Sequence, residues 1–161
     1  MEGLKEDIIF DMISNIENKN SILDEVFDIT MSQKQSLFNK DIDSFEEALE
    51  EKESLFSRLD MLNKDFEDFI KNSMGDCDNE LEEVKNKVIN SNDKLRLLYK
   101  QTKDIVKNIE QVDKENLAEV KIIMAELKDQ IETQNKVKKV EQTYYSEFYQ
   151  DENSCYFDSK K

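Results

Sequence analysis

The sequence predicts an all-α fold: an antiparallel helical hairpin plus a long third helix, packed as a three- to four-helix bundle, with an aromatic C-terminal tail or short helix. Composition is the first reason, because the chain has no Pro, only two Gly and 38% charged residues. Helices tolerate such a composition, whereas sheets and turn-rich folds do not. The second reason is an apolar stripe over residues 81–112, at alternating steps of three and four residues. This spacing places one apolar face along a helix, which another surface must cover.

The N-terminal region predicts either one long helix or two shorter ones. Apolar residues lie at helical spacing between residues 5 and 17, and a polar run follows at residues 17–21. Asn20 or Ser21 in that run is a suitable N-cap for a new helix. The seven-residue repeat that continues through the polar run favours a single helix instead. Its members are Ile9, Ile16, Leu23, Thr30 and Leu37.

The next element is predicted to pair with the first as an αα-hairpin with a short loop. The first arm ends near residues 39–40, and two capping boxes follow, Asp43 with Glu46 and Ser44 with Glu47. The second arm is expected to bury Phe45, Leu49, Leu55, Phe56, Leu59, Leu62, Phe66, Phe69 and Ile70. Gly75 ends this arm, because glycine suits the left-handed position after a helix. Asn79, paired with Glu82, is the expected cap of the next helix.

The third helix carries the stripe named above. Its positions are Leu81, Val84, Val88, Ser91, Leu95, Leu98, Thr102, Ile105, Ile109 and Val112. The pattern then slips by one residue and resumes as Leu117, Val120, Met124, Leu127 and Ile131. Asp113 is a candidate N-cap at the slip, with Val112 and Leu117 as a hydrophobic staple. Since the slip contains neither Gly nor Pro, one long, bent helix is favoured over a break.

The C-terminal part differs in composition from the rest. Lys136, Lys138 and Lys139 form a small basic patch in an acidic chain. Six aromatic residues follow, namely Tyr144, Tyr145, Phe148, Tyr149, Tyr156 and Phe157. These aromatics either fold back on the bundle or dock on a partner. We expect one all-α domain over residues 1–150 and a tail over residues 151–161.

Charge and hydropathy disfavour several partners. With 23 basic and 38 acidic residues the net charge is −15, so nucleic acids and anionic membrane surfaces repel the chain. No apolar run approaches the ~20 residues needed for membrane insertion, and the N-terminus lacks the apolar core of a signal peptide. The chain is therefore expected to be cytoplasmic, with Cys77 and Cys155 as free thiols.

The residue types also disfavour catalysis. The chain has no His, which removes histidine-based nucleophile pairs and the common zinc and di-iron sites. The two glycines are isolated, so there is no phosphate-binding loop. The carboxylates fall on the predicted solvent faces of helices. We expect no enzyme activity, no metal and no cofactor.

The predicted helices carry more apolar surface than one seam requires. Ile122 and Ile123 stand beside Met124, and Leu97 and Tyr99 flank Leu98 in the same way. Such a surplus predicts a groove for the amphipathic helix of a partner. The alternative is a structural coiled-coil homodimer, a scaffold with no client, which the heptads also permit.

Several segments resemble the flagellar type III export chaperones, first the FliT class and second the FlgN class. The third helix matches over residues 104–117 and 124–131 and closes at Tyr144, and the hairpin matches over residues 37–45 and 50–56. The terminal residues 156–161 are also similar to those of some members. The resemblance covers roughly residues 21–161. Residues 1–20 and the length of the third helix depart from it.

This resemblance implies a cytoplasmic chaperone that binds the helical end of a filament-cap or hook-associated subunit and delivers it to the export gate. In the family the long third helix holds the client, and a mobile C-terminal helix regulates access. Carried over to this chain, the client-binding residues are Val120, Ile123, Met124, Leu127 and Ile131. The residues implied for contact with the export gate are Tyr144, Tyr145, Phe148 and Tyr149.

Overall fold

The computed structural model is all-α, as predicted, with four helices packed as a bundle. It describes the backbone of residues 2–74 and 81–158, and the side chains of residues 6–72, 82–83 and 85–146. The helices are α1 (Glu2–Phe38), α2 (Ile42–Met74), α3 (Leu81–Ser91) and α4 (Asp93–Asp158). The chain forms two compact units, a first unit over Met1–Leu117 and a second unit over Ala118–Lys161, so their boundary lies inside α4. The boundary predicted at residue 150 stays a prediction.

Helix α1 is continuous, so the single-helix alternative is the right one for the N-terminal region. Asn20 is not a cap but a buried residue in the middle of α1. Its side-chain N–H donates to the Leu98 carbonyl oxygen at 3.3 Å, and its Oδ1 accepts from the Thr102 hydroxyl at 2.5 Å. A polar residue in the repeat therefore fastens α1 to α4, which satisfies its own buried polar atoms.

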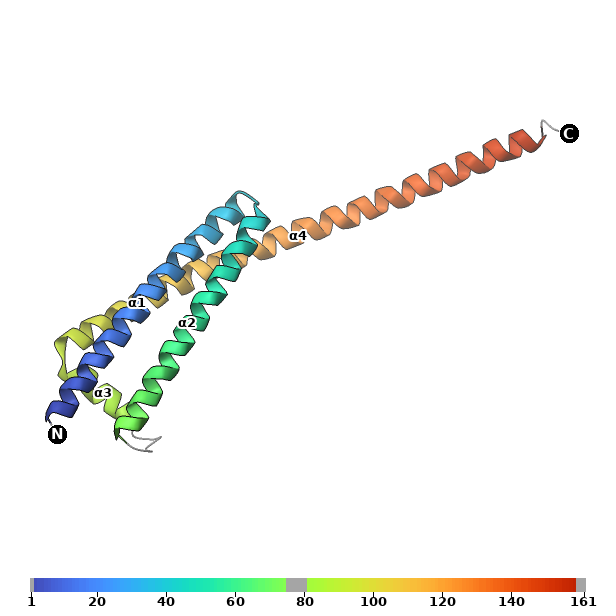
Figure 1. The fold of residues 1–161 in the computed structure, drawn as a ribbon. Coiled ribbons are helices and arrows are strands. Elements are labelled where there is room, and N and C mark those ends of the chain that lie inside the picture. Colours follow the sequence, from blue (N-terminus) through green and yellow to red (C-terminus); the bar gives the residue numbers. More distant parts are fainter. Residues whose placement is uncertain (1, 75–80, 159–161) are drawn as a thin grey trace. The chain divides into compact units, whose positions relative to one another are not determined.

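Helices α1 and α2 are joined by a short turn (Figure 1). Its backbone hydrogen bonds form a Schellman motif, and a capped helix start follows. Lys40 takes the left-handed position with φ 55°, and the Asp41 N–H donates to the Ser36 carbonyl at 2.8 Å. The predicted capping boxes are wrong, because Asp41 caps α2. Its carboxylate accepts from the Ser44 N–H at 3.1 Å and from the Ser44 hydroxyl at 2.7 Å, and these bonds lower the pKa of Asp41.

Helix α2 ends at Met74, where an end was expected, while Gly75, Cys77, Asn79 and the helix cap predicted there lie outside the described residues. Its inward face differs partly from the prediction, since Leu49 and Phe56 are exposed. The buried or partly buried positions instead follow a 4-3 spacing. They are Phe45, Ala48, Lys52, Leu55, Leu59, Leu62, Phe66 and Phe69, and Ile70 beside them is buried as well, so Phe45, Leu55, Leu59, Leu62, Phe66, Phe69 and Ile70 are placed as predicted. The inward face thus contains a lysine that hydrophobicity alone assigns to solvent.

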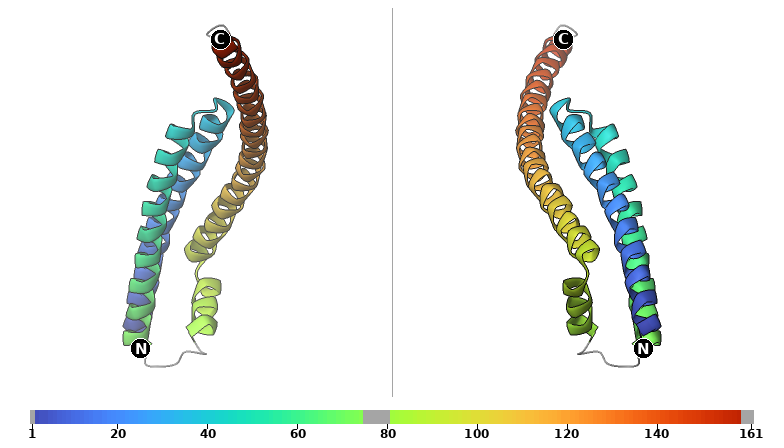
Figure 2. Two further views of the ribbon diagram at one scale, coloured as in Figure 1. Left: turned by 90° about the vertical axis from the view of Figure 1, so that its right-hand side faces the viewer. Right: turned by 90° about the vertical axis from the view of Figure 1, so that its left-hand side faces the viewer.

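The single helix predicted across residues 81–112 is wrong, because α3 and α4 are separate helices joined at Asn92 (Figure 2). The Asn92 side-chain oxygen accepts from the Leu95 N–H at 3.1 Å, and the Asn92 carbonyl accepts from the Arg96 N–H at 3.0 Å. The Ser91 hydroxyl donates to the Val88 carbonyl at 2.8 Å, in the last turn of α3. Asn92 is therefore the N-cap of α4.

The first unit holds two apolar clusters, which we call the N-terminal cluster and the central cluster. The N-terminal cluster joins all four helices through Ile8, Met12, Ile16, Phe66, Ile70, Ile89, Leu95 and Leu98. The central cluster joins α1, α2 and α4 through Ile22, Leu23, Val26, Leu55 and Ile109. Asn20 lies between the two clusters along α1, and its partner Thr102 lies between them along α4.

Two lysines approach the Phe66 ring of the N-terminal cluster. Lys19 of α1 and Lys85 of α3 place their ammonium groups 6.0 Å and 5.5 Å from the ring centre. Burial lowers the pKa of Lys19, and repulsion from Lys85 lowers it further. The aromatic face partly compensates the two cations, so this contact ties α3 to the hairpin. Tyr99 in the same region has its pKa raised by burial and by the nearby Glu82.

A set of polar residues that we call the polar layer follows the central cluster. It consists of Thr30, Gln33, Lys52, Asp113 and Asn116. The Lys52 ammonium donates to Asp113 at 2.6 Å and to Gln33 at 3.4 Å, and the Asn116 side chain donates to the Thr30 carbonyl at 3.1 Å. The polar layer therefore connects α1, α2 and α4. Asp113 accepts from Lys52 and is not an N-cap, so α4 runs unbroken, as favoured.

Candidate partner-binding surface

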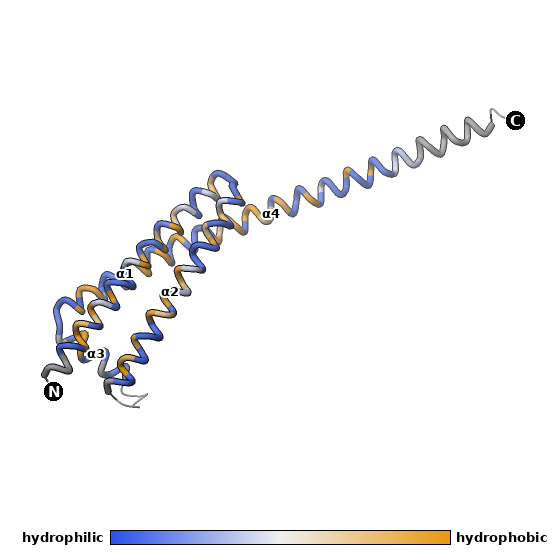
Figure 3. The backbone as a smooth tube through the Cα atoms, viewed as in Figure 1, coloured by the Kyte–Doolittle hydropathy of each residue, from blue (hydrophilic) through white to orange (hydrophobic). Residues whose placement is uncertain are grey.

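The candidate surface lies on α4, where apolar side chains remain exposed in the second unit. Figure 3 shows apolar residues recurring among hydrophilic ones along this part of α4. Met124, Leu127 and Ile131 are 64%, 47% and 56% exposed. We call these three residues the α4 apolar face. Their steps of three and four residues place them on one side of the helix. They line an open hollow of about 400 Å³, with Lys128 and Glu132 at its edge.

The other two predicted client residues are placed differently. Ile123 is only 7% exposed and Val120 is partly buried. Together with Asn116 they continue the buried stripe of the first part of α4 at steps of four and three. The apparent slip after Val112 is therefore an overlap of two stripes. The buried stripe runs through Asn116 and Val120, and a second, exposed stripe begins at Leu117, which is 55% exposed.

The aromatic residues predicted for the export gate are described only in part. Tyr144 and Tyr145 are 65% and 56% exposed, and their rings meet edge to face with centres 6.0 Å apart. The side chains of Phe148 and Tyr149 lie outside the described residues, as do those of Cys155, Tyr156 and Phe157. Helix α4 extends to Asp158, so the predicted aromatic segment is the last part of this helix.

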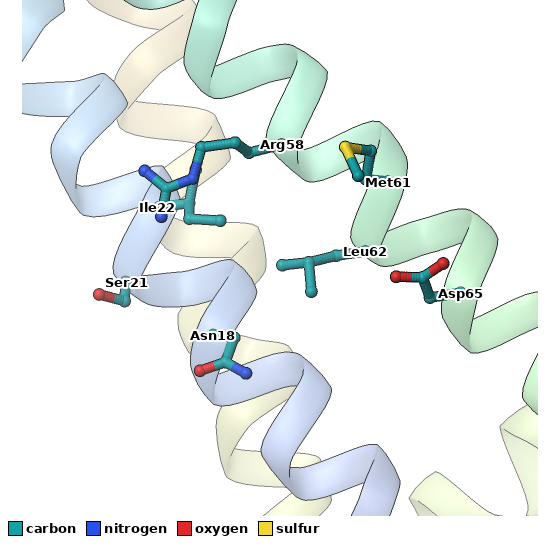
Figure 4. A pocket seen from close by; sticks show the side chains of 7 residues that line it. All are labelled: Asn18, Ser21, Ile22, Arg58, Met61, Leu62 and Asp65. Atoms are coloured by element: carbon teal, nitrogen blue, oxygen red, sulfur yellow. The ribbon is translucent and has the colours of Figure 1, made fainter.

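Another hollow, of about 360 Å³, lies between α1 and α2 (Figure 4). Leu62 and Ile22 supply apolar surface, and Arg58 and Asp65 of α2 add opposite charges, with the Arg58 guanidinium reaching across to α1 (Figure 4). This mixed lining lacks a nucleophile paired with a base. It is also shorter and more polar than the face that an amphipathic helix requires.

The described residues contain neither a cluster of metal-ligand side chains nor a helix suited to span a membrane. Within residues 2–74 and 81–158, no three Cys, Asp or Glu side chains converge as a metal site requires. In the same part of the chain, no helix is long and apolar enough to span a bilayer.

An exposed apolar face on a long helix of an all-α protein is the kind of surface that an amphipathic helix can occupy. Consistent with such a surface, residues 1–147 match the family model described as FlgN protein. The chain therefore belongs to the FlgN family, whose members are flagellar export chaperones for hook-associated proteins and are not enzymes. No curated protein and no solved structure matches the chain.

The match corrects one expectation from the sequence. The resemblance in the sequence favoured the FliT class over the FlgN class. This preference is not supported, because the family model that residues 1–147 match is that of FlgN. The match also begins at residue 1, so the N-terminal segment that seemed additional lies within the family region. In the structure this segment is the first half of α1 and supplies Ile8, Met12 and Ile16 to the N-terminal cluster.

Proposed function

We propose that this chain is a cytoplasmic export chaperone that holds a helical terminus of a hook-associated subunit and delivers it to the type III export gate. The α4 apolar face is the surface for the client. The observation that carries this proposal is the exposure of Met124, Leu127 and Ile131 to between 47% and 64%. Burying a side chain of this size against a partner contributes roughly 1.5–3 kcal/mol.

The proposal predicts that Leu127→Asp together with Ile131→Asp abolishes client binding. Two lost apolar contacts and two buried charges weaken the affinity for a purified hook-associated protein by at least about 100-fold, which corresponds to about 2.7 kcal/mol. Isothermal titration calorimetry measures the change. Ile123 is unsuitable for this test, because at 7% exposure its replacement by Asp perturbs the fold as well.

Ile122→Asp together with Thr133→Asp is the charge-matched control. Ile122 is 52% exposed and Thr133 is exposed, and both lie about 120–180° around the helix from the three residues of the α4 apolar face. The control is expected to bind the client as the wild-type chain does. Equal binding by the Leu127→Asp/Ile131→Asp protein would remove the α4 apolar face from the proposal.

The exposed Tyr144 and Tyr145 are proposed to contact the export gate, together with Phe148 and Tyr149. The two rings pack edge to face, and the side chains stay 65% and 56% exposed. Replacing Tyr144 and Tyr145 by Ala is expected to leave client affinity within about twofold while export of the client into the medium falls. Normal export in a strain carrying this variant would contradict the assignment.

The alternative function, a coiled-coil homodimer scaffold without a client, uses the same stripe. Sedimentation at micromolar concentration distinguishes the two. A monomer that binds hook-associated proteins supports the chaperone, whereas a tight dimer that buries the α4 apolar face supports the scaffold.

A further inference from the structure

One column of lysines runs along α4 at strict seven-residue spacing. Its members are Lys100, Lys107, Lys114, Lys121 and Lys128, and all five are exposed. Seven residues are nearly two helical turns, so successive members lie on one side of the helix with a drift of about 20°. This alignment concentrates positive charge along one edge of a helix in a chain whose net charge is −15.

In the second unit the column borders the α4 apolar face. Lys121 and Lys128 each precede a member of that face by three residues, Met124 and Ile131 respectively. In heptad terms, Met124 and Ile131 occupy position a, Leu127 occupies position d, and the two lysines occupy position e. Position e flanks the seam, where its charge meets the charges that flank the seam of a bound helix.

Among the described residues, no carboxylate forms an ion pair with any of these five lysines. Within the described residues, the ion pairs to lysine use Lys34, Lys52 and Lys94. Lys100, Lys107, Lys114, Lys121 and Lys128 have no ion pair in that part of the chain. Cations that are aligned beside an apolar face and form no ion pair with the described carboxylates can pair with the carboxylates of a partner.

We propose that the lysine edge beside the α4 apolar face selects an amphipathic helix of the client that carries Asp or Glu at seven-residue spacing along one flank of its apolar stripe. This inference rests on the proposed function, because it specifies the chemistry of the client at the same surface. Such a helix places its apolar stripe on Met124, Leu127 and Ile131, and its carboxylates opposite Lys121 and Lys128.

A second copy of the chain does not fit this edge. In an antiparallel pair of these faces position e meets position e, so lysine meets lysine. In a parallel pair position e meets position g, which is Ile123 or Gln130 and offers no carboxylate. The lysine edge therefore complements an acidic helix from another protein and disfavours self-association through this face.

The test compares the full chain with the Lys121→Glu/Lys128→Glu variant in calorimetric titrations with a purified hook-associated protein. The variant is expected to bind about tenfold or more weakly at about 0.1 M salt, where charges interact over about 10 Å. The difference is expected to shrink towards twofold at about 1 M salt, where that length is about 3 Å. Lys64→Glu/Lys87→Glu, at exposed positions on α2 and α3, is the charge-matched control and is expected to bind as the wild-type chain does.

Two outcomes overturn the inference. If the Lys121→Glu/Lys128→Glu variant binds like the control while Leu127→Asp/Ile131→Asp loses binding, the apolar site stands and the acidic-helix selection fails. If sedimentation shows a dimer that Lys121→Glu/Lys128→Glu disrupts, the edge belongs to a second copy. Loss of the proposed function itself would appear separately, as unchanged binding by the Leu127→Asp/Ile131→Asp variant.

Discussion

Replacing Leu95 by Ala is expected to lower the free energy of unfolding by about 3 kcal/mol. Leu95 is 0% exposed and lies in the N-terminal cluster, where α1, α2, α3 and α4 all contribute side chains. Leu→Ala in a core loses the transfer free energy of the removed groups and adds the cost of the cavity that remains, together about 2–5 kcal/mol. The residue also lies three positions after the Asn92 cap, so the cavity opens beside the junction of α3 and α4.

Urea denaturation followed by far-UV circular dichroism measures this change. The expected result is a lower midpoint with an unchanged slope, because the surface exposed on unfolding stays the same. Leu97→Ala is the matched control, since Leu97 is on the same turn of α4 but 57% exposed. Its expected cost is below about 0.5 kcal/mol. Equal losses in the two variants would contradict the assignment of Leu95 to the core.

The apolar periodicity predicted much of this fold correctly. The stripe from Leu95 to Val112 is buried or partly buried at each of its positions. Of the two alternatives for the N-terminal region, the seven-residue repeat favoured the single helix, which is the one that α1 forms. Such patterns succeed because a helix surrounded by water must hide its apolar face, whatever covers it. The apolar surplus read from the pattern is exposed at Leu97, Ile122 and Met124, but Ile123 is buried. Leu127 and Ile131, which the family resemblance implied for the client, are exposed.

Helix boundaries were less predictable, because neighbouring residues compete for the same cap. Asp41, Asp43 and Ser44 are all good N-cap residues, and the structure uses Asp41 with Ser44 as its partner. At the start of α4, Asn92 caps a helix inside an apolar pattern that continues past it. The run of Asn, Ser, Asn and Asp at residues 90–93 was the available signal, since these residues favour caps over helix interiors.

Buried polar residues were missed for a different reason. Asn20, Lys52 and Asn116 each occupy an inward position, and each depends on a partner from another helix. A hydropathy pattern contains no information about such partners, because pairing depends on the register between helices. The apparent slip near Asp113 was therefore read as a defect in the stripe, although Asn116 continues the stripe as a buried polar member.

The polar layer leads to the second large effect, which is the expected destabilisation of Asp113→Ala by about 2–3 kcal/mol. The Lys52 side chain is 7% exposed, and its main partner is Asp113 at 2.6 Å. Removing the carboxylate leaves a buried ammonium with Gln33 at 3.4 Å as its remaining acceptor in the described structure. Breaking a fully buried pair in this way costs about 3–5 kcal/mol, and the expected value is lower because the Asp113 side chain is 43% exposed to screening water.

A substitution of the other member of the pair distinguishes this loss of a charge partner from a loss of packing. Lys52→Met keeps the aliphatic stem and removes the buried charge, leaving Asp113 in partial contact with water, so its expected cost is about 1 kcal/mol or less. The Asp113→Ala/Lys52→Met protein is then expected to be more stable than Asp113→Ala alone, because no buried cation remains. Urea midpoints of the three variants measure the coupling. If the double variant is the least stable of the three, Lys52 and Asp113 contribute independently, and the polar layer does not join α2 to α4 through this pair.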